Sequence, residues 1–443
     1  MKIEELRTRI ANKTARLAVI GLGYVGLPVA SLFAEEGFDV LGIEIRSNHV
    51  AKINAGICPI EGHEPGLAEL LQRVVATGKL HATTEYGSSE DRDVFLIAVE
   101  TPVDEDNIPR YEALGSALTS LARVMQDGSL VIVESTIAPR TMQDFALPLL
   151  EKHSGKKVNE GFFLGNCPER VMTGKLLKNL RSLSRVVGGM NPGTSEAMIT
   201  LYRNIVQADL DPADCITAEL VKTAENAYRD VQIAFANEVA LIAEAAGGDV
   251  WKVRELVNKS PMRQMHLPGA GVGGHCIPKD PWLLAHGAAN HGVQLRLIPA
   301  AREVNNSMPL HMVKLLENAL AEMGKSLLDA RIGVLGYAYL EDSDDTRNSP
   351  TLALVARLYE LGAQPIIHDP WIPEYEGDIY ERVTGCDAVV VMVAHSAYRK
   401  IDLARLRLAL KQPILVDGRK IFDSVHAGET GFIYRRVGVS VGK

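Results

Sequence analysis

Short apolar runs alternate with amphipathic segments along the first third of the chain. Residues 16–45 read RLAVIGLGYVGLPVASLFAEEGFDVLGIEI, which predicts a strand, a glycine turn, a helix and a second strand. Further strands are predicted at Val94–Val99 and Leu130–Glu134, with a helix at Glu112–Met125 between them. Strands that alternate with helices favour a parallel, doubly wound sheet.

The middle of the chain has a helical pattern. Residues Ile216–Ala246 keep a helical period until Gly247 and Gly248 stop it. A helix of roughly 30 residues would be roughly 45 Å long, which suits either a connection between domains or a dimer interface. Its apolar residues occupy more than one face, so we expect burial on several sides and at least a homodimer, or a higher homo-oligomer. These residues are Val231, Ile233, Phe235, Val239 and Ile242.

Strand and helix alternation returns after Ala330. The order strand, glycine loop, helix, strand and acid repeats the order of the first region, although the second loop lacks GxGxxG. The chain is therefore predicted to be an α/β protein with two Rossmann-like doubly wound domains joined by a helical middle with a long central helix. The expected domains are 1–210, 211–325 and 326–443, with ligands in the cleft between the Rossmann-like domains. The later predicted elements are strands Arg331–Leu335, Gln364–His368, Ala388–Ala394 and Pro413–Asp417 and helix Ser349–Leu361.

Composition narrows the class of protein. The 443 residues are 47% apolar and 23% charged, which is typical of a globular protein. The net charge of -8, without a basic stripe, argues against a nucleic-acid partner. The N-terminal segment is charged and lacks the apolar core of a signal peptide, and the apolar runs are too short to span a bilayer. We therefore expect a cytoplasmic protein without a membrane partner.

A dinucleotide-binding fingerprint, GLGYVG, follows the first strand and opens the next helix. Gly21 permits the tight turn, Gly23 lets the backbone approach a pyrophosphate, and Gly26 lets the helix and strand pack closely. The helix N-terminus then directs its N–H groups at the phosphates. Glu44 ends the next strand, where a carboxylate accepts from ribose hydroxyls and repels a 2′-phosphate. We predict NAD, although Arg46 could neutralise such a phosphate; the alternative is a Rossmann unit with only a structural role.

Cys276 is the strongest candidate for a nucleophile. It stands in GAGVGGHCIPKDPW, where four glycines precede His275. Glycine is costly to order, so this density suggests backbone that approaches a ligand. His275 and Lys279 would lower the pKa of the thiol and favour the thiolate; the alternative is an inert buried thiol. No metal site or disulfide framework is expected, and four cysteines are expected only to pack in the core: Cys58, Cys167, Cys215 and Cys386.

Polar residues on the long helix and after strands give further candidates. Lys222 and Asn226 share one helix face, where they could hold an alkoxide or a water; the alternative is a solvated polar face. Glu169 in NCPER is a candidate acid or base, and its alternative is a carboxylate at a helix N-terminus. Arg347 and Arg419 lie in polar turns after strands, which suits forked phosphate binding.

Together these motifs resemble the UDP-sugar 6-dehydrogenase family, which includes UDP-glucose and UDP-N-acetylhexosamine dehydrogenases. The resemblance extends from about residue 15 to 435. It rests on motifs in the family's order: GLGYVGLP, TP at 101–102, EST at 134–136, PER at 168–170, AELVKTAENA, GVGGHCIPKDPW, DDTRNSP and DGR. The resemblance implies NAD as the cofactor and a UDP-sugar as the substrate.

The resemblance also implies roles for individual residues. Cys276 would capture the C6 aldehyde, Lys222 and Asp280 would stabilise the reacting oxygen or water, and Asn226 would hold the substrate. The residues implied to assist water in the hydrolysis step are Glu169 and Thr136. The residues implied to contact the cofactor are Gly21, Gly23, Tyr24, Val25, Gly26, Glu44, Arg46, Thr101, Thr136 and Arg347. The residues implied to contact the substrate are Glu169, Arg170, Lys222, Asn226, Arg263, Gly273, His275 and Arg419. For Arg263 and Arg419 the implied role is a contact with the substrate diphosphate or a contact that crosses between subunits.

Two departures from the glucose branch bear on the substrate. That branch looks like GGSCFPKD at the nucleophile, whereas His275 and Trp282 here are similar to the N-acetylhexosamine branch, particularly its N-acetylmannosamine members. Leu340 stands where the family often has a substrate-binding lysine. The expected reaction is oxidation of C6 of a UDP-N-acetylhexosamine, with N-acetyl-D-mannosamine first, to the uronate in two hydride transfers through a Cys276 thiohemiacetal and thioester. The alternatives are the N-acetylgalactosamine, N-acetylglucosamine or glucose substrates, a single-hydride dehydrogenase and a non-catalytic NAD-binding regulator.

Overall fold

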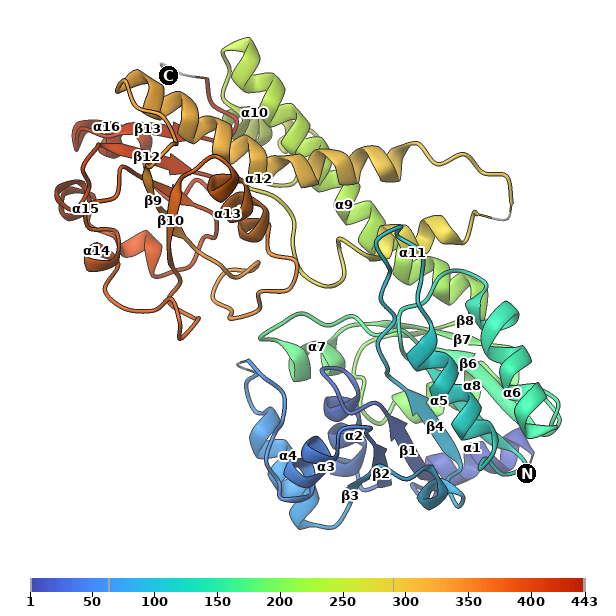
Figure 1. The fold of residues 1–443 in the computed structure, drawn as a ribbon. Coiled ribbons are helices and arrows are strands. Elements are labelled where there is room, and N and C mark those ends of the chain that lie inside the picture. The colour runs from blue at the N-terminus through green and yellow to red at the C-terminus, as the bar shows by residue number, and fades with distance from the viewer. Residues whose placement is uncertain (1, 63, 290, 441–443) are drawn as a thin grey trace. The chain divides into compact units, whose positions relative to one another are not determined.

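The computed structural model describes residues 2–62, 64–289 and 291–440, which form two compact units (Figure 1). Unit 1 comprises Met1–Glu225 and Trp282–Val293, and unit 2 comprises Asn226–Pro281 and Gln294–Lys443. Each unit contains one sheet covered by helices. The predicted α/β class, with two Rossmann-like regions and a helical middle, is confirmed; the domain bounds at 210 and 325 stay a prediction.

The sheet of unit 1 has eight strands in the order β3-β2-β1-β4-β5-β6-β7-β8. Its first six positions follow the 3-2-1-4-5-6 order of a dinucleotide-binding fold. Every pair is parallel except β6 with β7. The strands are β1 Arg16–Ile20, β2 Asp39–Ile43, β3 Leu80–Thr83, β4 Val94–Ile97, β5 Ser129–Val133, β6 Phe162–Asn166, β7 Arg185–Gly189 and β8 Leu210–Asp214.

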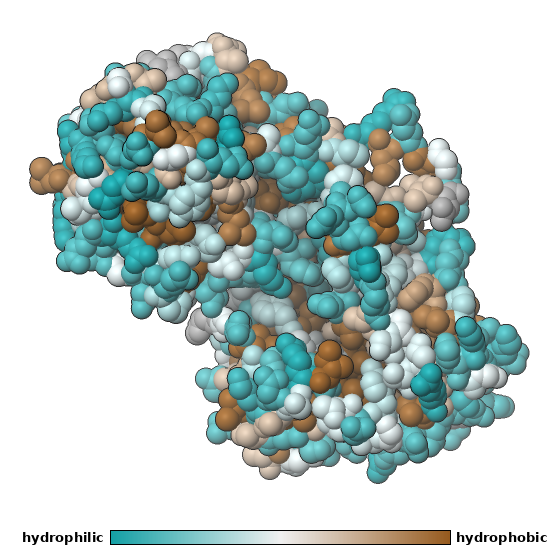
Figure 2. All heavy atoms as spheres, viewed as in Figure 1, coloured by the Kyte–Doolittle hydropathy of each residue, from teal (hydrophilic) through white to brown (hydrophobic). Residues whose placement is uncertain are grey.

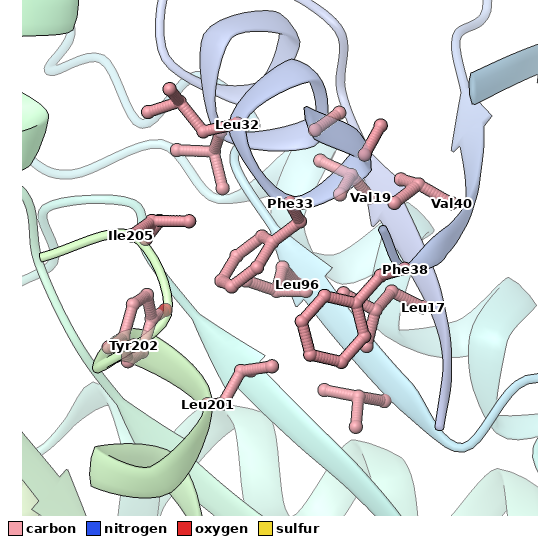
Figure 3. Close-up of a cluster of buried hydrophobic side chains, with 14 of the residues drawn as sticks. Leu17, Val19, Leu32, Phe33, Phe38, Val40, Leu96, Leu201, Tyr202 and Ile205 are labelled. Carbon is pink, nitrogen blue, oxygen red and sulfur yellow. The ribbon is translucent and has the colours of Figure 1, made fainter. Parts of the chain in front are cut away.

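Helices cover both faces of this sheet because its central strands are apolar on both sides. Leu17 and Val19 pack with α1, α2, α4 and α8, whereas Ala18 and Ile20 pack with α5 and α6. Figure 3 shows the first of these clusters, in which the Phe33 ring packs against other aromatic rings. The helices are α1 Ile3–Ala11, α2 Gly26–Glu35, α3 Ser47–Asn54, α4 Leu67–Ala76, α5 Glu112–Ala122, α6 Leu147–Ser154, α7 Leu176–Ser182 and α8 Pro192–Tyr202.

The sheet of unit 2 has five parallel strands in the order β10-β9-β11-β12-β13. All four predicted strands are present. The strand predicted at Ala388–Ala394 ends earlier, at Val391. The sequence overestimates its length because Met392 and Val393 are apolar and buried, although they belong to the following loop. The elements are β9 Arg331–Leu335, β10 Gln364–His368, β11 Ala388–Val391, β12 Ile414–Asp417, β13 Ile433–Arg436, α13 Pro350–Glu360, α14 Ile379–Arg382, α15 Leu403–Ala409 and α16 Ser424–Glu429.

The helical middle is built on α9, Cys215–Ala246, which has 32 residues. The sequence pattern did not predict a second long helix, α12, Leu297–Glu322, which contains Pro309 in its interior. Within unit 2 a buried ion pair of 2.7 Å between Arg302 and Asp230 joins α12 to α9. The shorter helices of this region are α10 Val250–Val257 and α11 Asp280–His286.

Hydrophilic residues cover most of the face seen in Figure 2, with small hydrophobic groups between them. Among residues 2–62, 64–289 and 291–440, no helix combines the length and apolarity needed to cross a membrane. Within the same ranges, no three His, Cys, Asp or Glu side chains are grouped so that they could hold a metal ion.

Candidate active site

The glycine loop after β1 has the shape that a dinucleotide requires. Gly21 has φ +87°, and a Cβ there would lie 2.7 Å from the carbonyl oxygen of Ala98. A Cβ on Gly26 would lie 1.9 Å from the carbonyl oxygen of Gly21, whereas a Cβ on Gly23 would meet no atom within 4 Å. The outer glycines are therefore enclosed by protein and the middle one is open. This arrangement fits a pyrophosphate beside Gly23 and the N-terminus of α2.

Tyr24 of the fingerprint is held by a residue that sequence reasoning missed. Its hydroxyl donates to Glu64, which also accepts from the N–H of Gly174 at 2.7 Å and from that of Leu176 at 3.2 Å. Val25, the next residue, packs partly buried against the core of unit 1. No motif marks Glu64, because its three partners come from two distant segments.

Glu44 lies beside the glycine loop, at the carboxyl end of β2. One carboxylate oxygen accepts from the N–H of Leu22 at 3.1 Å, and the other accepts from Nε of Arg46 at 2.8 Å. Burial alone would raise the pKa of Glu44, but its bonds to Arg46 hold the pKa below its usual range. The side chain of Arg46 is half exposed. Glu44 is therefore ionised and faces a cation on its outer side.

The TP and EST motifs meet at the ends of β4 and β5. The hydroxyl of Thr101 donates to the carbonyl oxygen of Thr136 at 2.6 Å, and the hydroxyl of Ser135 donates to the carbonyl oxygen of Val99 at 2.6 Å. Two of the residues expected near the cofactor are thus brought together by side-chain bonds to the backbone.

Glu169 is buried, and its Oε2 has no hydrogen-bond partner among the described residues. A buried ion pair that the sequence did not predict interacts electrostatically with Glu169: Arg185 Nη1 is 3.2 Å from Oε1 of Glu134. The hydroxyl of Tyr202 donates to the same oxygen at 2.7 Å. Burial raises the pKa of Glu134, and the charge of Glu169 raises it further, while Arg185 opposes this. Burial alone would lower the pKa of Arg185, but the charges of its neighbours, Glu134 and Glu169 among them, raise it.

Lys222 is buried on α9, in the part of the helix that belongs to unit 1. Arg170 is already engaged in the same unit: its Nε donates to Glu225 of α9 at 3.0 Å, and its Nη1 donates to the carbonyl oxygen of Ser184 at 2.5 Å. A substrate contact of Arg170 stays a prediction.

Cys276 differs from the other four cysteines in its exposure. Its thiol is exposed, whereas Cys58 is half-buried and the rest are buried. Burial raises the pKa of Cys167 to about 11 and that of Cys215 to about 12, so these thiols stay protonated at neutral pH. The expectation that the other cysteines only pack agrees with these positions, and the thiol of Cys276 is accessible.

The charges around Cys276 differ from the expectation in one respect. Burial lowers the pKa of His275, and the charges of Lys279 and Arg347 lower it further, so His275 is neutral rather than a cation. Lys279 Nζ lies 2.8 Å from Oδ1 of Asp280. Arg347 is a cation that interacts with Cys276: its pKa is raised first by Asp345 and also by the charge of Cys276.

Asp280 is fixed from two sides within unit 2. Besides its ion pair with Lys279, its Oδ2 accepts from Nδ2 of Asn226 at 2.5 Å. The structure thus brings together two of the predicted catalytic residues, Asn226 on α9 and Asp280 at the start of α11. The carboxylate is almost wholly buried.

Two of the glycines before Cys276 have a packing role that the sequence did not predict. A Cβ on Gly273 would lie 2.6 Å from the carbonyl oxygen of Asn348, and a Cβ on Gly274 would lie 2.7 Å from the ring of Tyr339. The N–H of Gly274 donates to the carbonyl oxygen of Arg347 at 2.9 Å, and the side-chain Nδ2 of Asn348 donates to the carbonyl oxygen of Gly274 at 3.1 Å. Gly273 and Gly274 therefore pack the loop against the 339–350 segment, and a ligand contact of this loop stays a prediction.

Two arginines complete the predicted set. Arg419 donates from Nε to the carbonyl oxygen of Met392 at 2.7 Å and from Nη2 to that of Gly271 at 3.3 Å, and burial lowers its pKa. Arg263 is exposed and donates to the carbonyl oxygen of Pro261 at 3.0 Å. Arg419 thus supports the same glycine loop, and ligand contacts for both arginines stay predictions.

Known protein families match the chain in three consecutive parts. Residues 15–206 match the NAD binding domain of the UDP-glucose/GDP-mannose dehydrogenase family, residues 216–307 match its central domain, and residues 333–424 match its UDP binding domain. The chain is 38% identical to a UDP-N-acetyl-D-mannosamine dehydrogenase of Pyrococcus horikoshii, over 96% of this chain and 99% of the relative.

Solved structures give the same answer. The structure of UDP-D-ManNAc dehydrogenase from Pyrococcus horikoshii matches with a TM-score of 0.90 at 38% identity and covers 96% of this chain and 99% of that one. The NDP-N-acetyl-D-galactosaminuronic acid dehydrogenase of Methanosarcina mazei Go1 matches with a TM-score of 0.87 at 34% identity, over 99% and 98% of the two chains. The chain therefore belongs to the UDP-glucose/GDP-mannose dehydrogenase family, as an NAD-dependent UDP-sugar dehydrogenase.

Proposed function

We propose that the substrate is UDP-N-acetyl-D-mannosamine and that its C6 hydroxymethyl group is oxidised to a carboxylate. One observation carries the proposal: a relative that is 38% identical over nearly its whole length is named for this sugar. His275 beside the nucleophile, in place of the serine of the glucose branch, supports it. N-acetylgalactosamine is the second candidate, because a relative from Ralstonia solanacearum named NDP-N-acetyl-D-galactosaminuronic acid dehydrogenase is 34% identical over 92% of this chain.

A substrate panel tests this choice. NADH formation is measured with UDP-ManNAc, UDP-GalNAc, UDP-GlcNAc and UDP-glucose at equal concentrations, and kcat/KM is compared. We expect UDP-ManNAc to give the highest value. A higher kcat/KM for UDP-glucose would reject the hexosamine assignment, and turnover that stops at the aldehyde would favour a single-hydride enzyme.

The proposed reaction uses two molecules of NAD and one of water for each sugar. Bound NAD supplies the hydride acceptor for both oxidations at C6. Lys222 and Asp280 stabilise the reacting oxygen, and Asn226, bonded to Asp280, fixes the orientation of that carboxylate. The Cys276 thiolate adds to the aldehyde and forms a thiohemiacetal, which is oxidised to a thioester. Covalent capture divides a difficult oxidation into easier steps and retains the reactive aldehyde.

Hydrolysis of the thioester releases the uronate and restores the thiol. We propose that Glu169 takes a proton from the attacking water and that Thr136 helps to hold that water. The buried, unpartnered Oε2 of Glu169 supports this role, because a buried polar atom without a protein partner is commonly satisfied by water.

We further propose that the chain forms at least a homodimer through α9. Tyr228, Phe235 and Ile242 follow one another at intervals of seven, so they share one helix face. Each is more than half exposed, at 65%, 58% and 59%. A row of large apolar side chains on an exposed helix face is typical of an interaction surface, and a second copy of this helix is its proposed partner.

Sedimentation tests the assembly. Phe235→Glu should shift the species toward the monomer at micromolar concentration. Leu408→Glu is the matched control, since Leu408 is 87% exposed and lies outside the helical middle. A wild-type monomer would reject the proposal.

A cytoplasmic location, which suits an enzyme that draws on the cellular NAD pool, is tested by cell fractionation.

A further inference from the structure

The loop between β5 and α6 carries Thr136 and is anchored at both ends. At its start, Thr101 and Ser135 make the side-chain bonds described above. At its far end, the carboxylate of Glu219 accepts from two backbone N–H groups: Oε2 from Arg140 and Oε1 from Met142, each at 2.7 Å. The second anchor is 79 residues away along the chain and lies on α9.

Glu219 lies three residues before Lys222, so the two side chains leave adjacent turns of the same helix face. The backbone that Glu219 holds is unusual. Arg140 has φ +76°, which non-glycine residues rarely adopt, and Met142–Ala146 forms a short π-helix, an element frequent at functional sites. Such a conformation persists only where the surroundings determine it, and the two bonds to Glu219 are part of those surroundings.

The form of Glu219 that makes both bonds is the carboxylate. Each of its oxygens accepts one N–H, whereas a protonated carboxyl group turns one oxygen into a donor that faces another donor. Glu219 is almost wholly buried. We propose that ionised Glu219 is a positioning residue that ties the Thr136 loop to the turn of α9 that carries Lys222. This inference rests on the proposed function, in which both residues act on the substrate.

The surrounding charges set the pH at which this anchor is present. Burial raises the pKa of Glu219 to about 7, opposed by its bonds to Met142 and Arg140. Asp144 raises this pKa further and the guanidinium of Arg140 lowers it. Two other titratable groups interact with Glu219, Tyr111 before α5 and Cys215 at the start of α9, and burial raises the pKa of both, so they are neutral at this pH. As the pH falls through about 7, Glu219 takes up a proton and one anchor bond is lost.

Glu219→Gln removes the charge and leaves one acceptor oxygen for two donors. We expect kcat to fall roughly 10- to 100-fold, because a small misplacement of a catalytic group has effects of that order. KM for the UDP-sugar should change much less. The wild-type kcat should decline below a midpoint near 7, and this decline should be absent in Glu219→Gln.

Two further variants sharpen the test. Asp144→Asn removes an exposed negative charge that raises the pKa of Glu219. The kcat of this variant should therefore decline at a lower pH than that of the wild type. Glu196→Gln changes an exposed glutamate of the same unit and should leave kcat and the pH profile unchanged. Wild-type kcat and an unchanged acid limb in Glu219→Gln would overturn the inference.

Amide hydrogen exchange separates this inference from the proposed function. Peptides that cover residues 136–146 should exchange faster in Glu219→Gln than in the wild type at pH 8, with Glu196→Gln as the control. If the protein oxidised no UDP-sugar, the proposed function would fail while the exchange result still decided whether Glu219 holds the loop. Equal exchange in all three proteins would reject the anchoring role.

Discussion

Both sheets have a carboxylate at the carboxyl end of their second strand, beside the loop that follows the first strand. In unit 1 this residue is Glu44, which accepts one N–H of the glycine loop and otherwise faces the half-exposed Arg46. In unit 2 it is Asp369, which accepts from the N–H groups of Tyr337 at 2.7 Å and Ala338 at 3.0 Å. The buried ring of His395 lies against the same oxygen at 3.1 Å.

The two carboxylates differ in their burial and in their remaining hydrogen-bond partners. The remaining contacts of Glu44 are with the backbone N–H and the half-exposed side chain of Arg46. Asp369 is fully buried, and its second oxygen accepts from the N–H of Trp371 at 2.9 Å. Topology therefore places an acid at the carboxyl end of the second strand in both sheets. Local packing leaves Glu44 beside a half-exposed arginine but encloses Asp369 completely, and a ribose contact of Glu44 stays a prediction.

Removal of Cys276, the proposed nucleophile, should have the largest effect. Cys276 lies in unit 2, whereas the fingerprint lies in unit 1. Cys276→Ala should therefore reduce uronate formation by roughly 10³-fold or more, in line with other nucleophile deletions, while NAD binding is retained. Product is measured by mass spectrometry and NAD binding by calorimetry.

Cys276→Ser tests whether the side chain at this position forms a covalent bond to the substrate. A serine hydroxyl is far less ionised, and its ester hydrolyses more slowly than a thioester, so a sugar adduct should accumulate on the protein. Intact mass spectrometry detects it. Wild-type uronate formation by Cys276→Ala would eliminate the covalent step.

Asp369→Asn should have the next largest effect, on stability alone. Burial by itself would raise the pKa of Asp369, but its bonds from His395 and Ala338 hold the pKa below the usual range. The stabilisation of the folded state by ionised Asp369 is therefore complete above the ordinary aspartate pKa. It is lost as the pH falls through the lower pKa that Asp369 has in the folded state. We expect a loss of about 3–5 kcal/mol at pH 7 by chemical denaturation. A tenfold weaker affinity for NAD in this variant would contradict the division of roles.

Glu44→Ala should have a smaller effect, and on ligand binding. Loss of a charged acceptor for the ribose hydroxyls should weaken NAD binding about tenfold, which corresponds to about 1.4 kcal/mol. Discrimination against NADP should relax in the same variant. Glu44→Gln is the control, because it keeps an acceptor without the charge. If wild-type protein uses NADP as well as NAD, the role given to Glu44 is wrong.

Arg46→Gln should have the smallest effect. The side chain of Arg46 is half exposed, and solvent weakens its ion pair with Glu44. Loss of this ion pair should therefore change the free energy of unfolding by no more than about 1 kcal/mol. The same change removes a cation that could accept a 2′-phosphate, and residual activity with NADP should fall a few-fold. Thermal unfolding and kcat/KM with each cofactor measure the two effects. A rise in NADP use would contradict the argument.

The sequence alone determined the features that depend on neighbours along the chain. The glycine fingerprint requires a tight turn, an open position and a close contact within six residues, and Gly21, Gly23 and Gly26 meet these needs. The period of apolar residues placed α9 to within one residue at its start, because helix faces repeat every few residues. The order of motifs also identified the family, since each motif is a local string.

Only the tertiary structure decided which distant groups meet. Nothing near Glu219 in the chain indicates that it binds the backbone at Arg140, and nothing near Arg185 indicates that Glu134 is its partner. The glycines before Cys276 predicted a ligand loop, and only the fold shows that two of them also pack against the ring of Tyr339 and the backbone of Asn348. Burial likewise made His275 neutral where its sequence neighbours suggested a cation. A pKa and a packing contact both depend on atoms brought close by the fold, and a linear pattern carries no record of them.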